Sequence, residues 1–340
     1  MKNQQRNASS LNMMVLVGVL GLFLMGGYTK GRITHAEISP VQTITHDGFQ
    51  NIDSIVLDEA GRIYISDIHS VKVFNSAGDL VTDIGSQGTG QGEFTNEVIG
   101  LAINSRNELF IVDQDGTRVQ VFDLQGNYLR SFGEKGNSDG QFQEPQGITV
   151  DTLDLVYVAD KKRNDIQIFS RGGEYLYSFG KSGAPGSDLN EPESMAIHQE
   201  RLYVADEENR RVQIYDLRGK HLGHLPHSGV FNLDSQLEAS LDDVVNHTDV
   251  ENKFHRYLDG DIEGVAFDGK GLLYILNEDA GEIIVFQKEK MVGVFTSSVP
   301  VLSGDGMAFD SQLLHLYVVD QGNSQIQVFD VQVIHDLLGI

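Results

Sequence analysis

The chain has 340 residues, no cysteine and a formal net charge of −24 at pH 7. The missing cysteines exclude disulfides, thiolate metal sites and an anchor built on a lipidated cysteine. So acidic a surface repels the phosphates of nucleic acids and attracts cations, so we expect no nucleic-acid partner.

The first residues have the pattern of an export signal. Lys2 and Arg6 precede an unbroken run of apolar residues and glycines from Met13 to Met25. This run is short for a membrane span and has the length of a signal-peptide core.

A cleavage site follows at some distance from the apolar run. Thr34-His35-Ala36 fits the small-residue pattern of such a site, with Glu37 as the new N-terminus. We therefore assign residues 1–36 to a signal peptide or an N-terminal membrane anchor. Residues 37–340 are expected outside the cytoplasm, in the periplasm or secreted, with any membrane contact made only through an uncleaved anchor.

One pattern recurs six times along the rest of the chain. Each copy has a glycine, a short apolar strand, a turn, a second strand ending in Asp or Asn, and a third ending in an aromatic residue. The second strands end, about 46 residues apart in most cases, at Asp67, Asp113, Asp160, Asp206, Asn277 and Asp320. Six copies of short strands with glycine-rich turns predict an all-β fold, a six-bladed β-propeller.

The last copy lacks a fourth strand, because only Val331 to Ile340 follows its third. The segment from Val41 to Thr45 has the character of a fourth strand, and residues 46–49 that of its exit turn. We expect this N-terminal strand to complete the last blade and close the ring, which removes exposed sheet edges.

The spacing between Asp206 and Asn277 is longer than the others. The excess, about residues 224–258, is interpreted as a surface insertion with a short helix near residues 233–245. The insertion and its approach contain His221, His224, His227, His247 and His255, so a transition-metal site is the alternative.

The copies resemble NHL repeats over residues 41–330. The segment from Phe142 to Asp151 matches the opening of that repeat, and Asn209 to Asp216 matches its third strand. The resemblance implies the propeller fold and leaves the activity open, because propellers host many functions.

Candidate metal ligands come from the channel mouth, since the first strand of each blade lines the channel of a propeller. The residue before the repeat's glycine position is, in order, Asp53, Ile99, Gln146, Glu193, Glu263 and Asp305. The four carboxylates belong to consecutive blades once the ring closes. Crowded carboxylates repel one another and are the ligands that Ca²⁺ prefers, so we expect a Ca²⁺ site, with a hydrated acidic funnel as the alternative.

The turns between second and third strands lie on the same face. The fourth copy has Glu207 and Glu208 there, which we add to the candidate metal ligands. Cations beside a metal site suit a phosphorylated, anionic small-molecule substrate. The residues assigned to substrate binding are Lys161, Lys162, Arg163 and Arg210, with ordinary charged turns as the alternative.

Residues 191–323 resemble three successive blades of the β-propeller phytases. The resemblance lies in Glu191-Pro192-Glu193-Ser194 with Leu202 to Glu208, in His255 to Gly264, and in Gly304 to Gly322. In that family the corresponding acids hold calcium ions that bind and activate phosphate. This implies ligands at Glu193, Glu207 or Glu208, Glu263 and Asp305, whereas the family's early run of acids is replaced here by Asn51 to Ile55.

The leading hypothesis is therefore an exported, calcium-dependent phosphate-monoester hydrolase. A non-catalytic scaffold that binds a protein or glycan on the channel face is the first alternative, and a metal-dependent lactonase resembling gluconolactonases is the second. No catalytic residue is assigned, because the sequence has no Gly-x-Ser-x-Gly elbow, phosphate-binding loop or dinucleotide motif.

Overall fold

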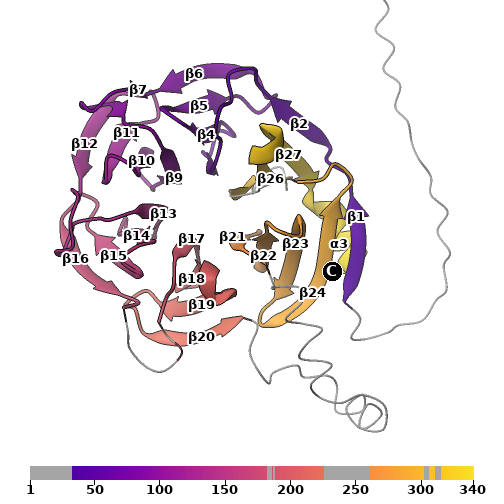
Figure 1. Cartoon of the computed structure of the whole chain (residues 1–340). Helices are drawn as coiled ribbons and strands as arrows, with labels where there is room; N and C mark the ends of the chain where they lie inside the picture. The colour runs from indigo at the N-terminus through magenta and orange to yellow at the C-terminus, as the bar shows by residue number, and fades with distance from the viewer. Residues whose placement is uncertain (1–32, 182–185, 187, 226–259, 302–305, 311–314) are drawn as a thin grey trace, which may run out of the picture. The chain divides into compact units, whose positions relative to one another are not determined.

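The structure is a computed structural model that describes residues 33–181, 186, 188–225, 260–301, 306–310 and 315–340. Within these residues, six sheets are arranged radially around a central channel (Figure 1). This arrangement confirms the prediction of an all-β, six-bladed propeller. The proposed helix near residues 233–245 and the histidines at 227, 247 and 255 lie outside the described residues.

The first three blades are four-stranded antiparallel meanders, numbered outward from the channel. Blade one contains β3 (Ile55–Leu57), β4 (Ile63–Asp67), β5 (Ser70–Phe74) and β6 (Leu80–Ile84). Blade two contains β9 (Val98–Ile103), β10 (Glu108–Asp113), β11 (Arg118–Asp123) and β12 (Tyr128–Phe132). Blade three contains β13 (Pro145–Val150), β14 (Val156–Asp160), β15 (Asp165–Phe169) and β16 (Tyr175–Phe179). A short parallel ribbon links blades one and two through β7 (Ser86–Gln87) and β8 (Glu93–Phe94).

The other three blades have the same inner three strands. Blade four contains β17 (Pro192–His198), β18 (Arg201–Asp206), β19 (Arg211–Asp216) and β20 (His221–Leu225). Blade five contains β21 (Ile262–Phe267), β22 (Leu272–Asn277), β23 (Glu282–Gln287) and β24 (Lys290–Ser297). Blade six contains β25 (Met307–Asp310), β26 (His315–Asp320) and β27 (Gln325–Asp330). Short 3-10 turns follow β18 and β26, at η1 (Glu207–Asn209) and η2 (Gln321–Asn323).

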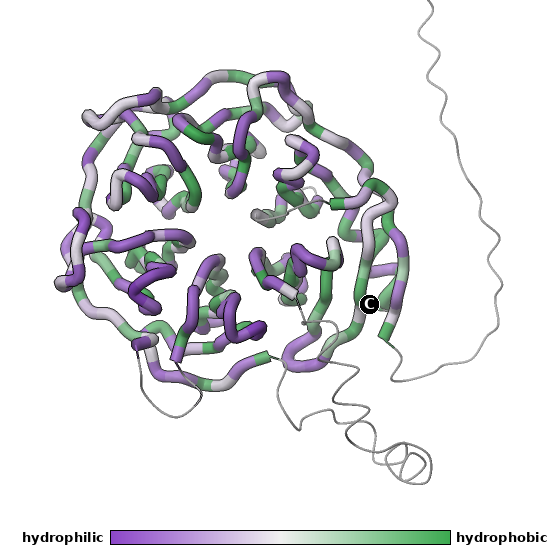
Figure 2. Tube along the Cα trace, in the orientation of Figure 1, coloured by the Kyte–Doolittle hydropathy of each residue, from purple (hydrophilic) through white to green (hydrophobic). Residues whose placement is uncertain are grey.

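Burial explains the residue types along each blade. The second strand of blade three, β14, is buried at every position, because neighbouring blades cover both of its faces. The outer strand β12 instead alternates between half-buried and exposed side chains up to its buried last residue, Phe132. The outer strands around the rim accordingly mix hydrophilic and hydrophobic residues in Figure 2.

The aspartate that ends a second strand is structural. The carboxylate of Asp160 accepts hydrogen bonds from the backbone N–H groups of Gln143 (2.7 Å), Glu144 (3.1 Å) and Arg163 (3.0 Å). It therefore holds the segment entering the first strand against the turn between the second and third strands. Both parts of blade three thus lie at one end of the propeller, which we call the mouth face.

The N-terminal strand closes the ring as predicted. The strand β2 (Gln42–Thr45) pairs antiparallel with β27, with Ile44 opposite Ile326. Ile44 is 3% exposed and belongs to the hydrophobic cluster between blades six and one. The fourth strand of the last blade therefore comes from the other end of the folded chain.

A second N-terminal strand differs from the expected domain boundary. The strand β1 (Thr34–Ile38) pairs in parallel with β24, as a fifth strand of blade five. The folded unit begins at Ile33, whereas the sequence placed the boundary after Ala36. The edge of β24 explains the difference, because an unpaired outer strand offers its backbone groups to a further strand.

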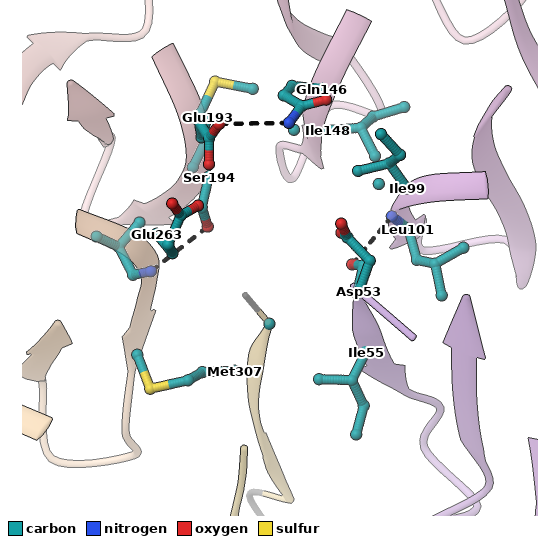
Figure 3. A pocket seen from close by; sticks show the side chains of 16 residues that line it. Asp53, Ile55, Ile99, Leu101, Gln146, Ile148, Glu193, Ser194, Glu263 and Met307 are labelled. Carbon is teal, nitrogen blue, oxygen red and sulfur yellow. Dashed lines mark hydrogen bonds between the residues drawn. The ribbon is translucent and has the colours of Figure 1, made fainter. Parts of the chain in front are cut away.

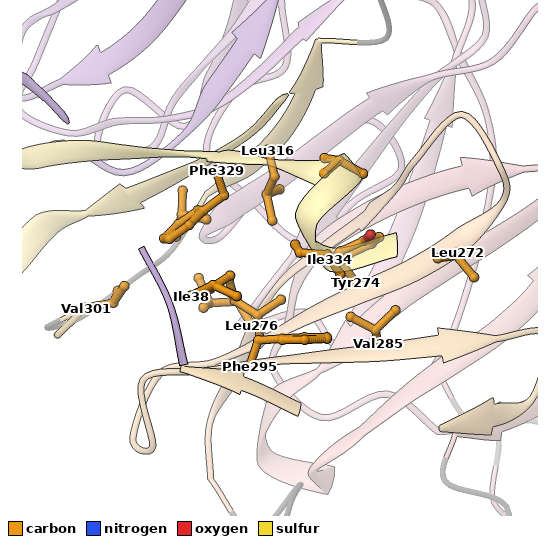
Figure 4. Close-up of a cluster of buried hydrophobic side chains, with 13 residues drawn as sticks. Ile38, Leu272, Tyr274, Leu276, Val285, Phe295, Val301, Leu316, Phe329 and Ile334 are labelled. Atoms are coloured by element: carbon orange, nitrogen blue, oxygen red, sulfur yellow. The ribbon is translucent and has the colours of Figure 1, made fainter. Parts of the chain in front are cut away.

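The C-terminal residues form a helix, α3 (Val331–Leu338), beside β1 and β24 (Figure 1). Its inner residues Val331 and Ile334 pack into the hydrophobic cluster between blades five and six (Figure 4). The sequence did not predict this helix. None of the helices in the described residues has the length and apolar composition that a membrane crossing requires.

Candidate metal and ligand site at the channel mouth

The central channel contains a cavity of about 220 Å³. Its wall is made by the first strands of all six blades, and its polar side chains include Asp53, Gln146, Glu193 and Glu263 (Figure 3). Apolar residues, among them Ile99, fill the rest of the wall. The structure therefore places in the channel the described residues that the repeat alignment assigned to it.

Tight packing between the first strands of neighbouring blades explains why glycine follows the mouth residue in the repeat. A Cβ atom at Gly147 would stand 2.0 Å from the carbonyl oxygen of Glu193, and one at Gly100 would stand 2.4 Å from that of Gln146. Only glycine allows two backbones to approach this closely. The glycine of one blade thus fixes the position of the mouth residue in the next.

Three glutamates converge at this mouth. Glu193 is the second residue of β17, Glu263 lies in β21 and Glu207 lies in η1, and one carboxylate oxygen of each lies within 4.8 Å of those of the other two. Glu193 is 8% exposed and Glu263 is 9% exposed. A second group, adjoining the first through Glu207, contains Glu191 and the exposed Glu208. The sequence had selected Glu193, Glu207, Glu208 and Glu263; the structure places three of them in the first group and Glu208 in the second.

The ammonium group of Lys161 lies among these carboxylates. It donates hydrogen bonds to Glu193 and to Oε2 of Glu207, the latter at 2.6 Å, and lies 3.4 Å from Oε2 of Glu191. The sequence assigned Lys161 to substrate binding. In the structure it is instead a counter-ion inside the glutamate cluster.

The close contacts shift the pKa values of the cluster. Burial raises the pKa of Glu207 to about 7, with Glu193 adding to the rise and Lys161 opposing it. Burial would also raise the pKa of Glu193, but hydrogen bonds with Glu263 and the charge of Lys161 outweigh it and lower that pKa. Burial by itself would lower the pKa of Lys161, but the hydrogen bonds and charges of Glu193 and Glu207 outweigh burial and raise this pKa. In the metal-free cluster Glu207 therefore holds its proton up to about neutral pH.

The other candidate residues lie apart from this cluster. Asp53 stands across the channel from Glu193 and Glu263 (Figure 3), and Asp305 lies outside the described residues. Lys162 is exposed and pairs with Glu144. Arg163 is 6% exposed, and its guanidinium bonds Asp165 at 3.1 Å and the carbonyl oxygen of Ser138 at 3.2 Å, inside blade three. Arg210 is exposed at the end of η1.

A second hollow of about 270 Å³ adjoins the channel over blades one to three, with Gln321 of blade six also in its wall. Its walls include Glu97, Gln114 and Glu144, which the sequence analysis did not select. Burial raises the pKa of Glu97, and the charges of Asp115 and Glu144 add to the rise. A signal for these residues was present, because Glu97, Glu144 and Glu191 all occupy the position two residues before the mouth residue.

Comparison with known protein families agrees with this architecture. Residues 37–133 match a family described as a 6-bladed beta-propeller, and residues 142–169 match the NHL repeat. The chain is a six-bladed β-propeller built from NHL repeats. A 66-residue stretch of this NHL propeller is 36% identical to Protein brain tumor of Drosophila melanogaster. That stretch is 19% of this chain and only 6% of the fly protein.

Solved structures share the fold of this NHL propeller at low identity. A catalytically inactive virginiamycin B lyase from Staphylococcus aureus, bound to quinupristin, has a TM-score of 0.56 and 12% identity over 86% of this chain and 88% of its own. A streptogramin B lyase has a TM-score of 0.55 and 11% identity over 85% and 86% of the two chains. At such identity the likeness shows the fold alone.

Proposed function

We propose that this NHL propeller binds a divalent cation, Ca²⁺, at its channel mouth and hydrolyses a phosphate monoester there. The observation that carries the proposal is the convergence of Glu193, Glu207 and Glu263 within 4.8 Å. Calcium–oxygen distances of about 2.3–2.6 Å allow two ligand oxygens on one ion to lie up to about 5 Å apart. The chemistry and spacing of the three carboxylates therefore suit one calcium ion, whose remaining ligands would be water and substrate oxygens.

The residues of the cluster have distinct roles in this proposal. A bound divalent cation supplies positive charge for phosphate oxygens and lowers the pKa of water. Glu193 is buried with a lowered pKa, so it offers an ionised ligand. Glu207, whose pKa is raised to about 7 in the metal-free cluster, would release its proton to become the third ligand, so ion binding would be coupled to proton release near neutral pH. Lys161 must give up its bonds to these two glutamates when an ion enters, and its ammonium is then free to pair with a phosphate oxygen.

The test is an activity screen of the purified full chain with Ca²⁺ and with EDTA. The substrates are phytate, para-nitrophenyl phosphate and a simple lactone, the last to detect the lactonase alternative. The proposal expects Ca²⁺-dependent release of phosphate that falls at least tenfold in Glu263→Gln. The matched control is Glu289→Gln, an exposed glutamate in the turn before β24, which should retain activity.

A non-catalytic scaffold is the second candidate, and the position of Lys161 favours it. Its ammonium already compensates part of the negative charge of Glu193 and Glu207, so the cluster can exist without a metal ion. In this reading the mouth face binds a protein or a glycan. A folded protein with no Ca²⁺ response and no turnover of any of the three substrates would support the scaffold and exclude the hydrolase.

A further inference from the structure

The second hollow, over blades one to three, differs in chemistry from the glutamate cluster. Its wall combines carboxylate, amide and apolar side chains, among them Glu97, Glu144, Gln114, Ile68 and Ile99. Within the described part of the chain, neither Glu97 nor Glu144 belongs to a group of three acidic side chains close enough to share one metal ion. The hollow therefore suits a larger cation, whose charge and hydrogen bonds are spread over several side chains.

The repeat places Gln114 and Lys161 at the same position in successive blades. Each residue follows the aspartate that ends the second strand of its blade. In blade two the backbone N–H of Gln114 donates to the carbonyl oxygen of Glu97 at 3.0 Å. In blade three the backbone N–H of Lys161 donates to the carbonyl oxygen of Glu144 at 2.9 Å. The two turns thus share this hydrogen bond, so their side chains can be compared directly.

Both side chains reach the mouth residue of the next blade. The amide group of Gln114 donates to the amide oxygen of Gln146. The ammonium group of Lys161 donates in the same way to Glu193. It also lies 3.4 Å from Oε2 of Glu191, which stands two residues before Glu193 in the sequence. An ammonium group at this position thus compensates the charge of a glutamate at the entrance of the following blade.

The glutamate that corresponds to Glu191 in blade three is Glu144, and it has no such lysine from the blade before it. The equivalent residue there is Gln114, whose amide is neutral. Glu144 pairs instead with Lys162, which is exposed and belongs to the same blade. The side of Glu144 that faces the hollow therefore lacks the ammonium group that Lys161 supplies one blade further on.

The corresponding glutamate in blade two is Glu97, and the equivalent residue of blade one is the apolar Ile68. Burial raises the pKa of Glu97, and the negative charges of Asp115 and Glu144 raise it further. A positive charge from a ligand would favour the ionised form of Glu97, as Lys161 does for the carboxylates of blade four.

Apolar side chains beside these carboxylates suit the carbon chain of an amine. Ile68 and Ile99 are half-buried in the wall of the hollow, and Val98 is buried there. A lysine-like side chain lays its methylene groups along apolar surface and places its ammonium group among acceptors. The wall offers both kinds of contact within one hollow.

We propose that the second hollow binds the alkylammonium group of a ligand, which takes there the place that Lys161 takes in the next blade. The carboxylates of Glu97 and Glu144 accept hydrogen bonds from the ammonium group, and Ile68 and Ile99 contact the carbon chain. A free aliphatic amine and the lysine side chain of a peptide both present this group. The inference goes beyond the proposed hydrolase and does not depend on a bound Ca²⁺.

Calorimetric titration of the full chain in EDTA tests the proposal, with Nα-acetyl-lysine amide and pentylamine as probes. Nα-acetyl-norleucine amide is the control ligand, because it keeps the alkyl chain and lacks the ammonium group. We expect an amine to bind and the norleucine compound not to bind. Binding of the lysine compound alone would identify a peptide as the source, and tighter binding of pentylamine would identify a free amine. Equal binding of the lysine and norleucine compounds, or no binding of either amine, would overturn the proposal.

Variants place the binding in the hollow. Glu97→Gln and Glu144→Gln should each weaken amine binding about tenfold, whereas Glu289→Gln, which removes an exposed charge in the turn before β24, should not weaken it. Gln114→Lys gives blade two the lysine that blade three has. Its ammonium group should fill the hollow, so this variant should lose amine binding and melt at a higher temperature, which separates a filled site from an unfolded one. Wild-type affinity in both glutamate variants, or in Gln114→Lys, would contradict the proposal.

Discussion

Nζ of Lys161 in blade three lies 2.6 Å from Oε2 of Glu207 in blade four. The same ammonium also bonds Glu193, so one lysine joins two glutamates of the neighbouring blade. In this NHL propeller a built-in cation thus occupies part of the space that a metal ion would need. The proposed calcium ion would therefore have to displace this ammonium group from the two glutamates.

Replacing Lys161 by methionine tests this competition. The variant leaves Glu193 and Glu207 without their cation, which in EDTA should lower the free energy of unfolding by about 2–3 kcal/mol. Because the competitor is gone, Ca²⁺ should bind the variant more tightly, by about tenfold. Urea unfolding and calorimetric titration measure the two effects.

The control for this variant is Lys162→Met, since Lys162 is the adjacent lysine and pairs with Glu144 on the surface. Its stability should change by less than about 0.5 kcal/mol. Unchanged calcium affinity in Lys161→Met would show that the lysine and the metal do not compete.

The raised pKa of Glu207 predicts a dependence of stability on pH. In EDTA the folded state holds the Glu207 proton up to about pH 7, whereas the unfolded chain loses it near pH 4.5. The folded state binds more protons within this window, so the contribution of Glu207 to stability is present below pH 4.5 and is lost as the pH rises to 7. Glu207→Gln should remove this loss, and its stability relative to wild type should rise between pH 5 and pH 8.

Denaturant unfolding at several pH values measures this effect, with Glu208→Gln as the control on the exposed neighbour. Saturating Ca²⁺ should also remove the wild-type slope, because a metal ion favours the ionised carboxylate. Equal slopes for wild type and Glu207→Gln would mean that Glu207 is ionised throughout the window.

The close approach of neighbouring first strands predicts the effect of Gly147→Ala. The new Cβ would clash with the carbonyl oxygen of Glu193, so the two strands must separate. We expect a loss of more than about 2 kcal/mol in the free energy of unfolding and weaker Ca²⁺ binding, because Glu193 moves. Gly269→Ala is the matched control, since a Cβ there meets no atom within 4 Å. Wild-type stability in Gly147→Ala would refute the packing argument.

Most of the fold could be predicted from the sequence because each blade repeats the same residue types at a regular spacing. The aspartates that end the second strands and the segment from Val41 to Thr45 were enough to place six blades and the closing strand. The strand β1 was missed because its pairing is parallel and depends on the distant edge of β24. The helix α3 was missed because its apolar residues are too few to show a period before the core that receives them is known.

The candidate site was predicted in position but not in its internal contacts. The glycine position selected Glu193 and Glu263 because each blade repeats the same geometry. The pairing of Lys161 with Glu207 joins turns of two adjacent blades, and a repeat alignment shows equivalent positions rather than side-chain contacts. For the same reason the sequence assigned Arg163 to substrate binding, although its guanidinium points into blade three and pairs with Asp165.

Thermal unfolding shows most directly whether the channel mouth binds a calcium ion. Wild type and Glu263→Gln are melted in EDTA and in Ca²⁺ at a hundredfold excess over the dissociation constant, with Glu289→Gln as the control. We expect Ca²⁺ to stabilise wild type and the control by about 2.7 kcal/mol, a rise in Tm of about 5 °C, and to stabilise Glu263→Gln far less. Identical melting of wild type in EDTA and in Ca²⁺, or an equal rise in Glu263→Gln, would contradict this expectation.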